Sequence, residues 1–219
     1  MKNRTLYLVR HGALVTDEHR RFLGQMNVPL SEAGMAQAHA LHDRLQYSDV
    51  GRIYCSDLSR SQETATIIAG DRGIPVVPLW DLREISLGLW EGCAMAEIAA
   101  REPRAFRARG EDLEHYRPPG GESFKDCRTR VLTAVEEILA HADGGVLIVG
   151  HAGVNRLILC EALGIPISNL FRVGQEYGCL NVLECGDSGY RVVLVNFTPK
   201  NSWFDMPPVL PALEPVAVG

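Results

Sequence analysis

The stretch Thr5–Gly12, TLYLVRHG, ends an apolar run with a guanidinium, an imidazole and a residue that has no side chain. The β-rich run Thr5–Val9 predicts a short buried strand. A buried strand that ends in Arg10, His11 and Gly12 has three interpretations: a surface turn, a metal ligand, or a catalytic group held at the end of a sheet. The patterns that follow the other strands distinguish between them.

Strand and helix patterns alternate along the rest of the chain. Helices are predicted over 31–46, 57–70, 94–110 with a break at Pro103, 122–142 and 151–164. Strands are predicted over 52–56, 74–79 at a sheet edge, 145–150, and a hairpin formed by 179–185 and 190–197. Asp57 or Ser59 is the expected cap of the second helix.

This order of elements implies a mainly parallel sheet that is covered by helices on both faces. The simplest arrangement is one α/β domain over 1–200, in which 80–121 is inserted over one end of the sheet. The residues 201–219 are rich in proline, and an irregular C-terminal tail is expected there.

Composition and charge exclude several classes of protein. The 219 residues carry a net charge of −5, which argues against an extended nucleic-acid surface. The six cysteines form no CxxC pair, which argues against zinc. The longest apolar runs are far below the roughly 20 residues of a membrane helix. We expect a cytoplasmic protein without a metal, cofactor or membrane partner, and a homodimer is one assembly that this prediction allows.

Arginine, histidine or glutamate follows each of the predicted parallel strands. Arg10 and His11 follow the first strand, Arg60 opens the helix after the second, Glu84 comes after 74–79, and His151 comes after 145–150. Ligands of open α/β sheets bind at the carboxyl ends of the strands. We therefore expect these five side chains to gather at one edge of the sheet.

Such a set of side chains suits phosphoryl transfer. Arginine presents a planar fork of donors to phosphate oxygens, and glycines at a helix start, here Gly150 and Gly153, let backbone N–H groups approach an anion. A histidine kept neutral by neighbouring arginines offers a ring nitrogen as a nucleophile. A carboxylate can donate a proton to the leaving oxygen and then take one from water. The chemistry proceeds through a phosphohistidine and requires no metal.

Four motifs, in this order, resemble those of the histidine phosphatase (phosphoglycerate mutase-like) superfamily: LYLVRHG (6–12), CSDLSRSQETA (55–65), LREISLGLWEG (82–92) and IVGHAGV (148–154). The resemblance implies a three-layer α/β sandwich with a mixed, mostly parallel sheet flanked by helices. It implies that His11 is the phosphorylated nucleophile and that Arg10, Arg60 and His151 bind the phosphoryl group. Glu84 would then be the proton donor.

Other residues of these segments are further candidates for the site. Many members have Glu-Thr after RHG; Thr16 would supply the missing hydroxyl here. Ala152 replaces a glycine that commonly follows the second histidine. Gln25 and Arg83 are candidate substrate contacts. Glu91 is the alternative to Glu84 as the proton donor.

Within the superfamily, the segments 22–34 and 164–184 are most similar to α-ribazole phosphatases of cobalamin synthesis. The prediction is a phosphatase that hydrolyses a small phosphate monoester, with α-ribazole 5′-phosphate as the candidate substrate. A cofactor-dependent phosphoglycerate mutase is the alternative enzyme, although the segment after Glu84 lacks the Tyr-Gly-rich stretch typical of mutases. A non-catalytic module that binds a phospho-ligand is the third hypothesis.

Overall fold

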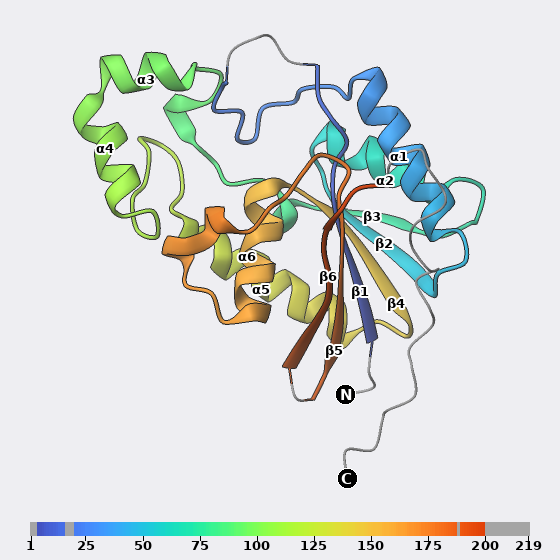
Figure 1. The fold of residues 1–219 in the computed structure, drawn as a ribbon. Coiled ribbons are helices and arrows are strands. Elements are labelled where there is room, and N and C mark those ends of the chain that lie inside the picture. Colours follow the sequence, from blue (N-terminus) through green and yellow to red (C-terminus); the bar gives the residue numbers. More distant parts are fainter. Residues whose placement is uncertain (1–3, 16–19, 188, 200–219) are drawn as a thin grey trace.

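The protein folds as a six-stranded sheet with helices on both faces (Figure 1). The computed structural model describes residues 4–15, 20–187 and 189–199. The strands are β1 (Arg4–Arg10), β2 (Val50–Ser56), β3 (Val76–Leu79), β4 (Gly145–Gly150), β5 (Leu180–Gly186) and β6 (Gly189–Phe197). The α-helices are α1 (Glu32–Leu45), α2 (Ser59–Ala69), α3 (Met95–Arg101), α4 (Pro103–Glu111), α5 (Phe124–Ala140) and α6 (Ala152–Leu163). Short 3₁₀ helices are η1 (Trp80–Leu82), η2 (Gly88–Trp90) and η3 (Ile167–Arg172).

The sheet has the strand order β3-β2-β4-β1-β5-β6. The first four of these strands are mutually parallel, whereas β5 runs antiparallel to β1 and β6 antiparallel to β5. The predicted mixed, mostly parallel sheet is therefore confirmed, together with its C-terminal hairpin. The short strand β3 lies at the edge, as its two flanking and internal prolines predict.

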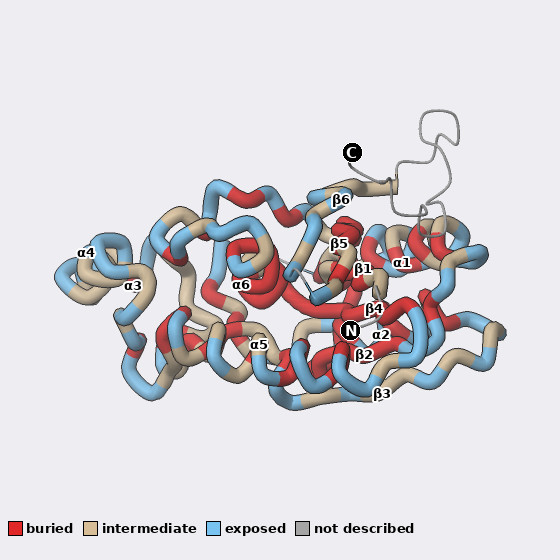
Figure 2. Tube along the Cα trace, turned by 90° about the horizontal axis from the view of Figure 1, so that it is seen from below, coloured by how far each residue is buried: buried red, intermediate tan, exposed pale blue. Residues whose placement is uncertain are grey.

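The alternation of side chains along β1 connects two hydrophobic cores. Leu6 and Leu8 pack into the core beneath α5 and α6, and Tyr7 and Val9 pack into the core beneath α1 and α2. Figure 2 shows this layering from below, with buried chain in the sheet and exposed chain on the outer sides of the helices. Because β1 is buried on both faces and paired on both edges, the residues that follow it start from a rigid position.

The helix starts differ in how well the sequence predicts them. Ser31 caps α1 by accepting a hydrogen bond from the Gly34 N–H, as its position suggests. The prediction that Asp57 or Ser59 caps α2 is wrong, because the N-cap residue is Leu58 and makes no side-chain cap bond. The Asp57 carboxylate instead binds Arg83 with both oxygens, at 2.6 and 2.8 Å.

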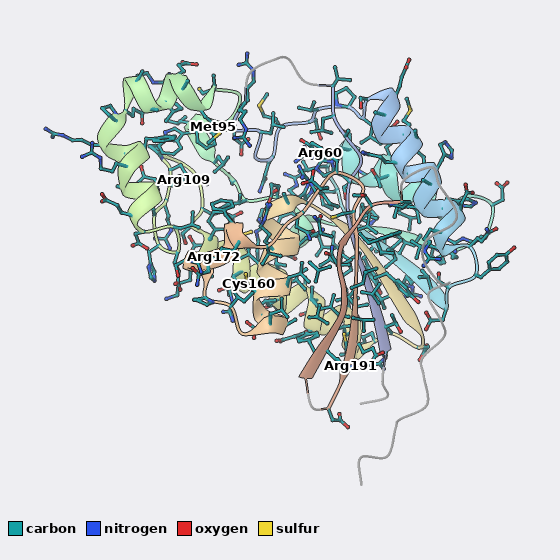
Figure 3. All side chains as sticks on the ribbon, viewed as in Figure 1. Arg60, Met95, Arg109, Cys160, Arg172 and Arg191 are labelled. Atoms are coloured by element: carbon teal, nitrogen blue, oxygen red, sulfur yellow. The ribbon has the colours of Figure 1, made fainter. Side chains whose placement is uncertain are left out.

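The segment 80–121 contains η1, η2, α3 and α4, and its two α-helices lie to one side of the sheet (Figure 1). Trp90 is fully buried and donates to the Glu102 carboxylate. Arg109, labelled in Figure 3, places its guanidinium 5.5 Å from the Phe22 ring and 5.9 Å from the Phe124 ring. These contacts join the segment to the rest of the chain. The division into a domain over 1–200 and a tail stays a prediction, and 201–219 lie outside the described residues.

No helix in the described part of the chain is long and apolar enough to cross a membrane.

Candidate active site

The charged residues predicted from the strand ends do lie at the carboxyl edge of the sheet. Arg10 ends β1, His11 follows it, Arg60 lies in the first turn of α2, Glu84 follows η1, and His151 links β4 to α6. Figure 3 shows Arg60 within the side chains above the strand ends. A cavity of about 230 Å³ opens there, lined by Arg10, His11, Leu14, Arg21, Phe22, Leu23, Gly24, Arg60, Glu84, Ile85, Leu87 and Tyr177.

The backbone of His11 is held on both sides. Its N–H donates to the Gly150 carbonyl and its carbonyl accepts from the Gly178 N–H, both at 3.1 Å. The ring Nδ1 lies 2.8 Å from the Gly12 carbonyl. Because a carbonyl only accepts, Nδ1 must carry the proton and Nε2 keeps its lone pair. The fold therefore fixes the tautomer in which Nε2 is the nucleophilic nitrogen.

Gly12 allows a close contact between the loop after β1 and the start of α1. A Cβ atom built on Gly12 would lie 2.3 Å from the Gly34 carbonyl oxygen, and one on Gly34 would lie 2.0 Å from the Ala13 carbonyl oxygen. Only glycines permit this approach. The Gly12 N–H also donates to the Thr64 hydroxyl at 3.2 Å.

Burial and positive neighbours keep both histidines neutral. Burial is the main cause that lowers the pKa of His11 well below its ordinary value, and the charges of Arg60 and Arg10 add to it. The pKa of His151 is likewise well below its ordinary value, through burial first and then the charge of Arg60. Both imidazoles are therefore neutral at neutral pH, each with a proton on only one ring nitrogen.

His151 lies behind His11 and is completely buried. The Arg60 Nε–H donates to its Nδ1 at 3.3 Å, so its other nitrogen, Nε2, carries the proton and donates to the Ser56 hydroxyl at 2.8 Å. His151 is not among the described residues that line the cavity. In this arrangement it contacts His11 and Arg60, and a direct bond to a phosphoryl group stays a prediction.

The two arginines are fixed by backbone carbonyls. Arg60 donates to the carbonyls of Met26 at 2.5 Å and Gly24 at 2.8 Å. With the bond to His151, three of its five N–H groups bind described partners, which leaves two for a ligand. Arg10 donates to the Gln175 carbonyl at 2.5 Å. Within the described part of the chain no group accepts from the buried Arg10 Nε.

The structure separates the two candidate proton donors. The Glu84 side chain lines the cavity, and its carboxylate accepts from the N–H groups of Gly153 and Ile85, both at 3.0 Å. A Cβ on Gly153 would lie 2.5 Å from this carboxylate, so the glycine makes room for it. Glu91 is not among the described cavity residues; its carboxylate binds the N–H groups of Gln25 and Leu87 and connects two loops.

The other candidate residues lie around the cavity without lining it, among the residues described. Gln25 donates from its amide to the Glu84 carbonyl at 3.0 Å. Arg83 is paired with Asp57, and Ala152 is the first residue of α6. Their substrate contacts stay predictions. Thr16 lies outside the described residues.

Tyr177 is a cavity residue that the sequence did not reveal. Its ring centroid is 5.5 Å from that of His11, and the Arg10 guanidinium lies 3.7 Å from the ring centroid. The chain before β5 reaches the catalytic edge because β5 pairs antiparallel with β1. An aromatic residue just before Gly178, close to the start of the predicted strand, is the sequence feature at Tyr177. The antiparallel pairing of that strand with β1 is what brings it to the site.

Together, these groups form an anion site with a neutral imidazole and a carboxylate at its wall. Among the described residues, no group of three or more His, Cys, Asp or Glu side chains is placed to hold a metal ion. The arrangement can bind a phosphate group through Arg10 and Arg60 and present His11 to its phosphorus atom.

Comparison with known proteins identifies the family. The model of the histidine phosphatase superfamily (branch 1) matches residues 6–198. An adenosylcobalamin/α-ribazole phosphatase of Salmonella typhimurium is 30% identical over 180 residues, covering 82% of this chain and 89% of that protein. The crystal structure of the α-ribazole phosphatase from Shigella flexneri gives a TM-score of 0.82 at 26% identity, covering 88% of this chain and 96% of the other. A mycobacterial glucosyl-3-phosphoglycerate phosphatase gives 0.79 at 29% identity, covering 89% and 99%. Because the family model covers most of the chain and agrees with the motifs and the fold, this chain belongs to the histidine phosphatase superfamily.

Proposed function

We propose that this phosphatase hydrolyses a small phosphate monoester through a phosphohistidine formed on His11. The observation that carries the proposal is the tautomer of His11. Its Nδ1–H binds the Gly12 carbonyl, so Nε2 is the ring nitrogen without a proton, and His11 lines a cavity that Arg10 and Arg60 also line. A buried neutral imidazole next to two phosphate-binding cations matches the requirements of a nucleophile for phosphorus.

In the first step, His11 Nε2 attacks the phosphorus atom and the bond from phosphorus to the ester oxygen breaks. Glu84, in its protonated form, gives its proton to the departing alcohol. In the second step, a water molecule gives its proton to the Glu84 carboxylate and attacks phosphorus, and the bond from nitrogen to phosphorus breaks. Arg10 and Arg60 hold the phosphoryl oxygens and stabilise their charge throughout. Inorganic phosphate and the free enzyme are the products.

For the substrate, we propose α-ribazole 5′-phosphate. The cavity lining has two relevant parts, the cations Arg10 and Arg60 and apolar side chains that include Phe22 and Leu87. α-Ribazole carries a flat, largely apolar benzimidazole base on its ribose, so its phosphate and base suit these two parts. The similarity of the chain to the α-ribazole phosphatases of Salmonella and Shigella supports the same choice.

A substrate panel tests both proposals. It contains α-ribazole 5′-phosphate, purine nucleotides, sugar phosphates and phosphoglycerates, and phosphate release is measured for each. We expect α-ribazole 5′-phosphate to have the highest kcat/KM, and His11→Ala to abolish turnover of every ester. Similar kcat/KM values for all of the esters would contradict the substrate assignment but not the phosphohistidine mechanism. Interconversion of phosphoglycerates after priming with bisphosphoglycerate would show a mutase instead.

The homodimer and the cytoplasmic location belong to this proposal as well. Light scattering on the purified protein tests the first, with twice the mass of a 219-residue chain as the expected result. Fractionation of cells that produce the protein tests the second.

A further inference from the structure

A partly buried ion pair lies next to the loop that carries Glu84. Arg130, on α5, binds the carboxylate of Glu122, which precedes the capping residue of the same helix. The side chains are 11% and 18% exposed, respectively. A pair largely removed from water is weak evidence for a gain in stability, because the cost of desolvating two charges offsets much of their attraction. Its contacts suggest another role.

The Arg130 guanidinium binds three backbone carbonyls of one short segment. One terminal nitrogen, Nη1, donates to the carbonyls of Asp81 at 2.7 Å and Arg83 at 2.8 Å. The other, Nη2, donates to the carbonyl of Glu84 itself at 3.1 Å. Arginine can do this because its donors form a rigid planar fork, whereas a lysine presents a single compact charge.

Glu122 extends the same set of contacts past Glu84. Its Oε1 accepts a hydrogen bond from the Ser86 N–H at 2.9 Å. The pair therefore holds the backbone on both sides of Glu84, and α5 is anchored in turn by a buried apolar stripe that includes Val131 and Val135. The side chain of Glu84 is held separately, by Gly153 at the start of α6.

We propose that Arg130, with Glu122, is a positioning residue for the proton donor Glu84. The inference rests on the proposed function, in which Glu84 protonates the leaving oxygen. A general acid must lie about 2.6–3.2 Å from the atom that it protonates, and a displacement of about 1 Å can reduce the rate about 100-fold. Loss of the fork releases the carbonyls of Asp81 and Arg83 and leaves the Glu84 carbonyl with the Gln25 amide. This allows such a displacement without removing any group that contacts the phosphate.

Leaving-group dependence distinguishes positioning of the acid from a general structural role. The oxygen of p-nitrophenyl phosphate departs as a stable anion and needs no proton, whereas an alkyl oxygen such as that of a ribose 5′-phosphate ester needs one. The measured quantity is kcat/KM, because it reports the transfer to His11 and not the later hydrolysis. A variant with a displaced Glu84 loses activity selectively on the alkyl ester. A variant with a distorted phosphate site loses activity on both.

The experiment compares wild type with Arg130→Gln and Arg130→Lys on p-nitrophenyl phosphate and on an alkyl 5′-phosphate. For Arg130→Gln we expect kcat/KM to fall about 100-fold on the alkyl ester and less than about 5-fold on the aryl ester. Arg130→Lys keeps the pairing with Glu122 and recovers part of the alkyl activity. The matched control is Arg128→Gln, on the same helix, which removes an exposed pair with Glu161 and leaves both rates unchanged.

Arg130→Gln leaves the partly buried Glu122 carboxylate without its cation, so the double variant Glu122→Gln/Arg130→Gln is measured beside it. Circular dichroism checks folding. Selective loss in the folded double variant supports the proposal. Equal losses on both esters, or none on either, overturn it. Failure of the proposed function has a different signature: wild type would turn over neither ester, or His11→Ala would keep wild-type rates.

Discussion

The ring of His11 lies 5.1 Å from the ring of His151 at an interplanar angle of 61°, and both imidazoles are buried. Arg60 donates to the inner ring and lines the cavity beside the outer one. Each histidine therefore experiences the same two conditions, burial and a nearby positive charge. Both conditions disfavour the protonated form, which keeps the nucleophile available and makes the fold sensitive to acid.

Stability should decrease in acid because of these two histidines. Their folded-state pKa values are well below the ordinary 6.5, so below about pH 6.5 the unfolded chain binds protons that the folded chain does not. The free energy of unfolding is therefore unaffected by these two groups above that pH, and it decreases as the pH falls towards their folded-state pKa values. Each histidine reduces the free energy of unfolding by up to about 1.4 kcal/mol per pH unit. Urea titrations between pH 7 and pH 5 measure it.

His151→Asn should make the pH dependence of unfolding shallower than in wild type. The matched control is His39→Asn, at an exposed position on α1, which should leave the slope unchanged. Equal slopes in wild type and His151→Asn would contradict the assignment of a low pKa to the buried ring.

The two glutamates should respond differently to substitution. Glu84→Gln removes the proton donor and should lower kcat/KM on an alkyl phosphate by about 10²–10⁴-fold, with little change in the thermal midpoint. Glu91→Gln changes a carboxylate that bonds two loop N–H groups and should lower the thermal midpoint more than the rate on any substrate. Steady-state kinetics and thermal denaturation of both variants decide between them, and the reversed pattern would make Glu91 the acid.

Tyr177 should act through Arg10. Tyr177→Leu removes the ring under the guanidinium, a contact of about 0.5–2 kcal/mol, and we expect KM to rise about 3- to 10-fold. Tyr177→Phe keeps the ring and should keep the wild-type KM. Tyr47→Leu is the control, because Tyr47 is 91% exposed. A Tyr177→Phe variant as impaired as Tyr177→Leu would show that the hydroxyl group is what matters.

Gly12→Ala should destabilise the fold. The new methyl group would meet the Gly34 carbonyl at 2.3 Å, so the backbone must move, and overpacking of this kind costs about 1–3 kcal/mol. Gly51→Ala serves as the comparison, since nothing lies within 4 Å of its built Cβ. Denaturant unfolding measures both, and a Gly12→Ala variant as stable as Gly51→Ala would contradict the close contact seen between the loop and α1.

The sequence predicted the strand ends well because their signals are local. β1 and the fully apolar β4 are each followed directly by a histidine, and parallel strands bring such ends to one edge. The four motifs of the superfamily, which occur in the same order along this chain, indicated the same residues. Arg10, His11, Arg60 and Glu84, which these signals predict as site residues, all line the cavity.

The residues that were missed depend on pairings between distant segments. Tyr177 reaches the site through the antiparallel pairing of β5 with β1, and Arg130 reaches the Glu84 loop across 46 positions of the sequence. The cap of α2 was predicted wrongly for the same reason, since Asp57 binds Arg83 and not its own helix. Local patterns contain no information about such partners.

The most direct test is to trap the phosphorylated enzyme. Wild type and His11→Ala are mixed briefly with a ³²P-labelled phosphate monoester and quenched in alkali, and the labelled peptide is identified. The account predicts an acid-labile label on His11 in wild type and no label in His11→Ala. A label on another residue, or turnover by wild type with no labelled intermediate while His11→Ala remains active, would contradict the assignment of His11 as the nucleophile.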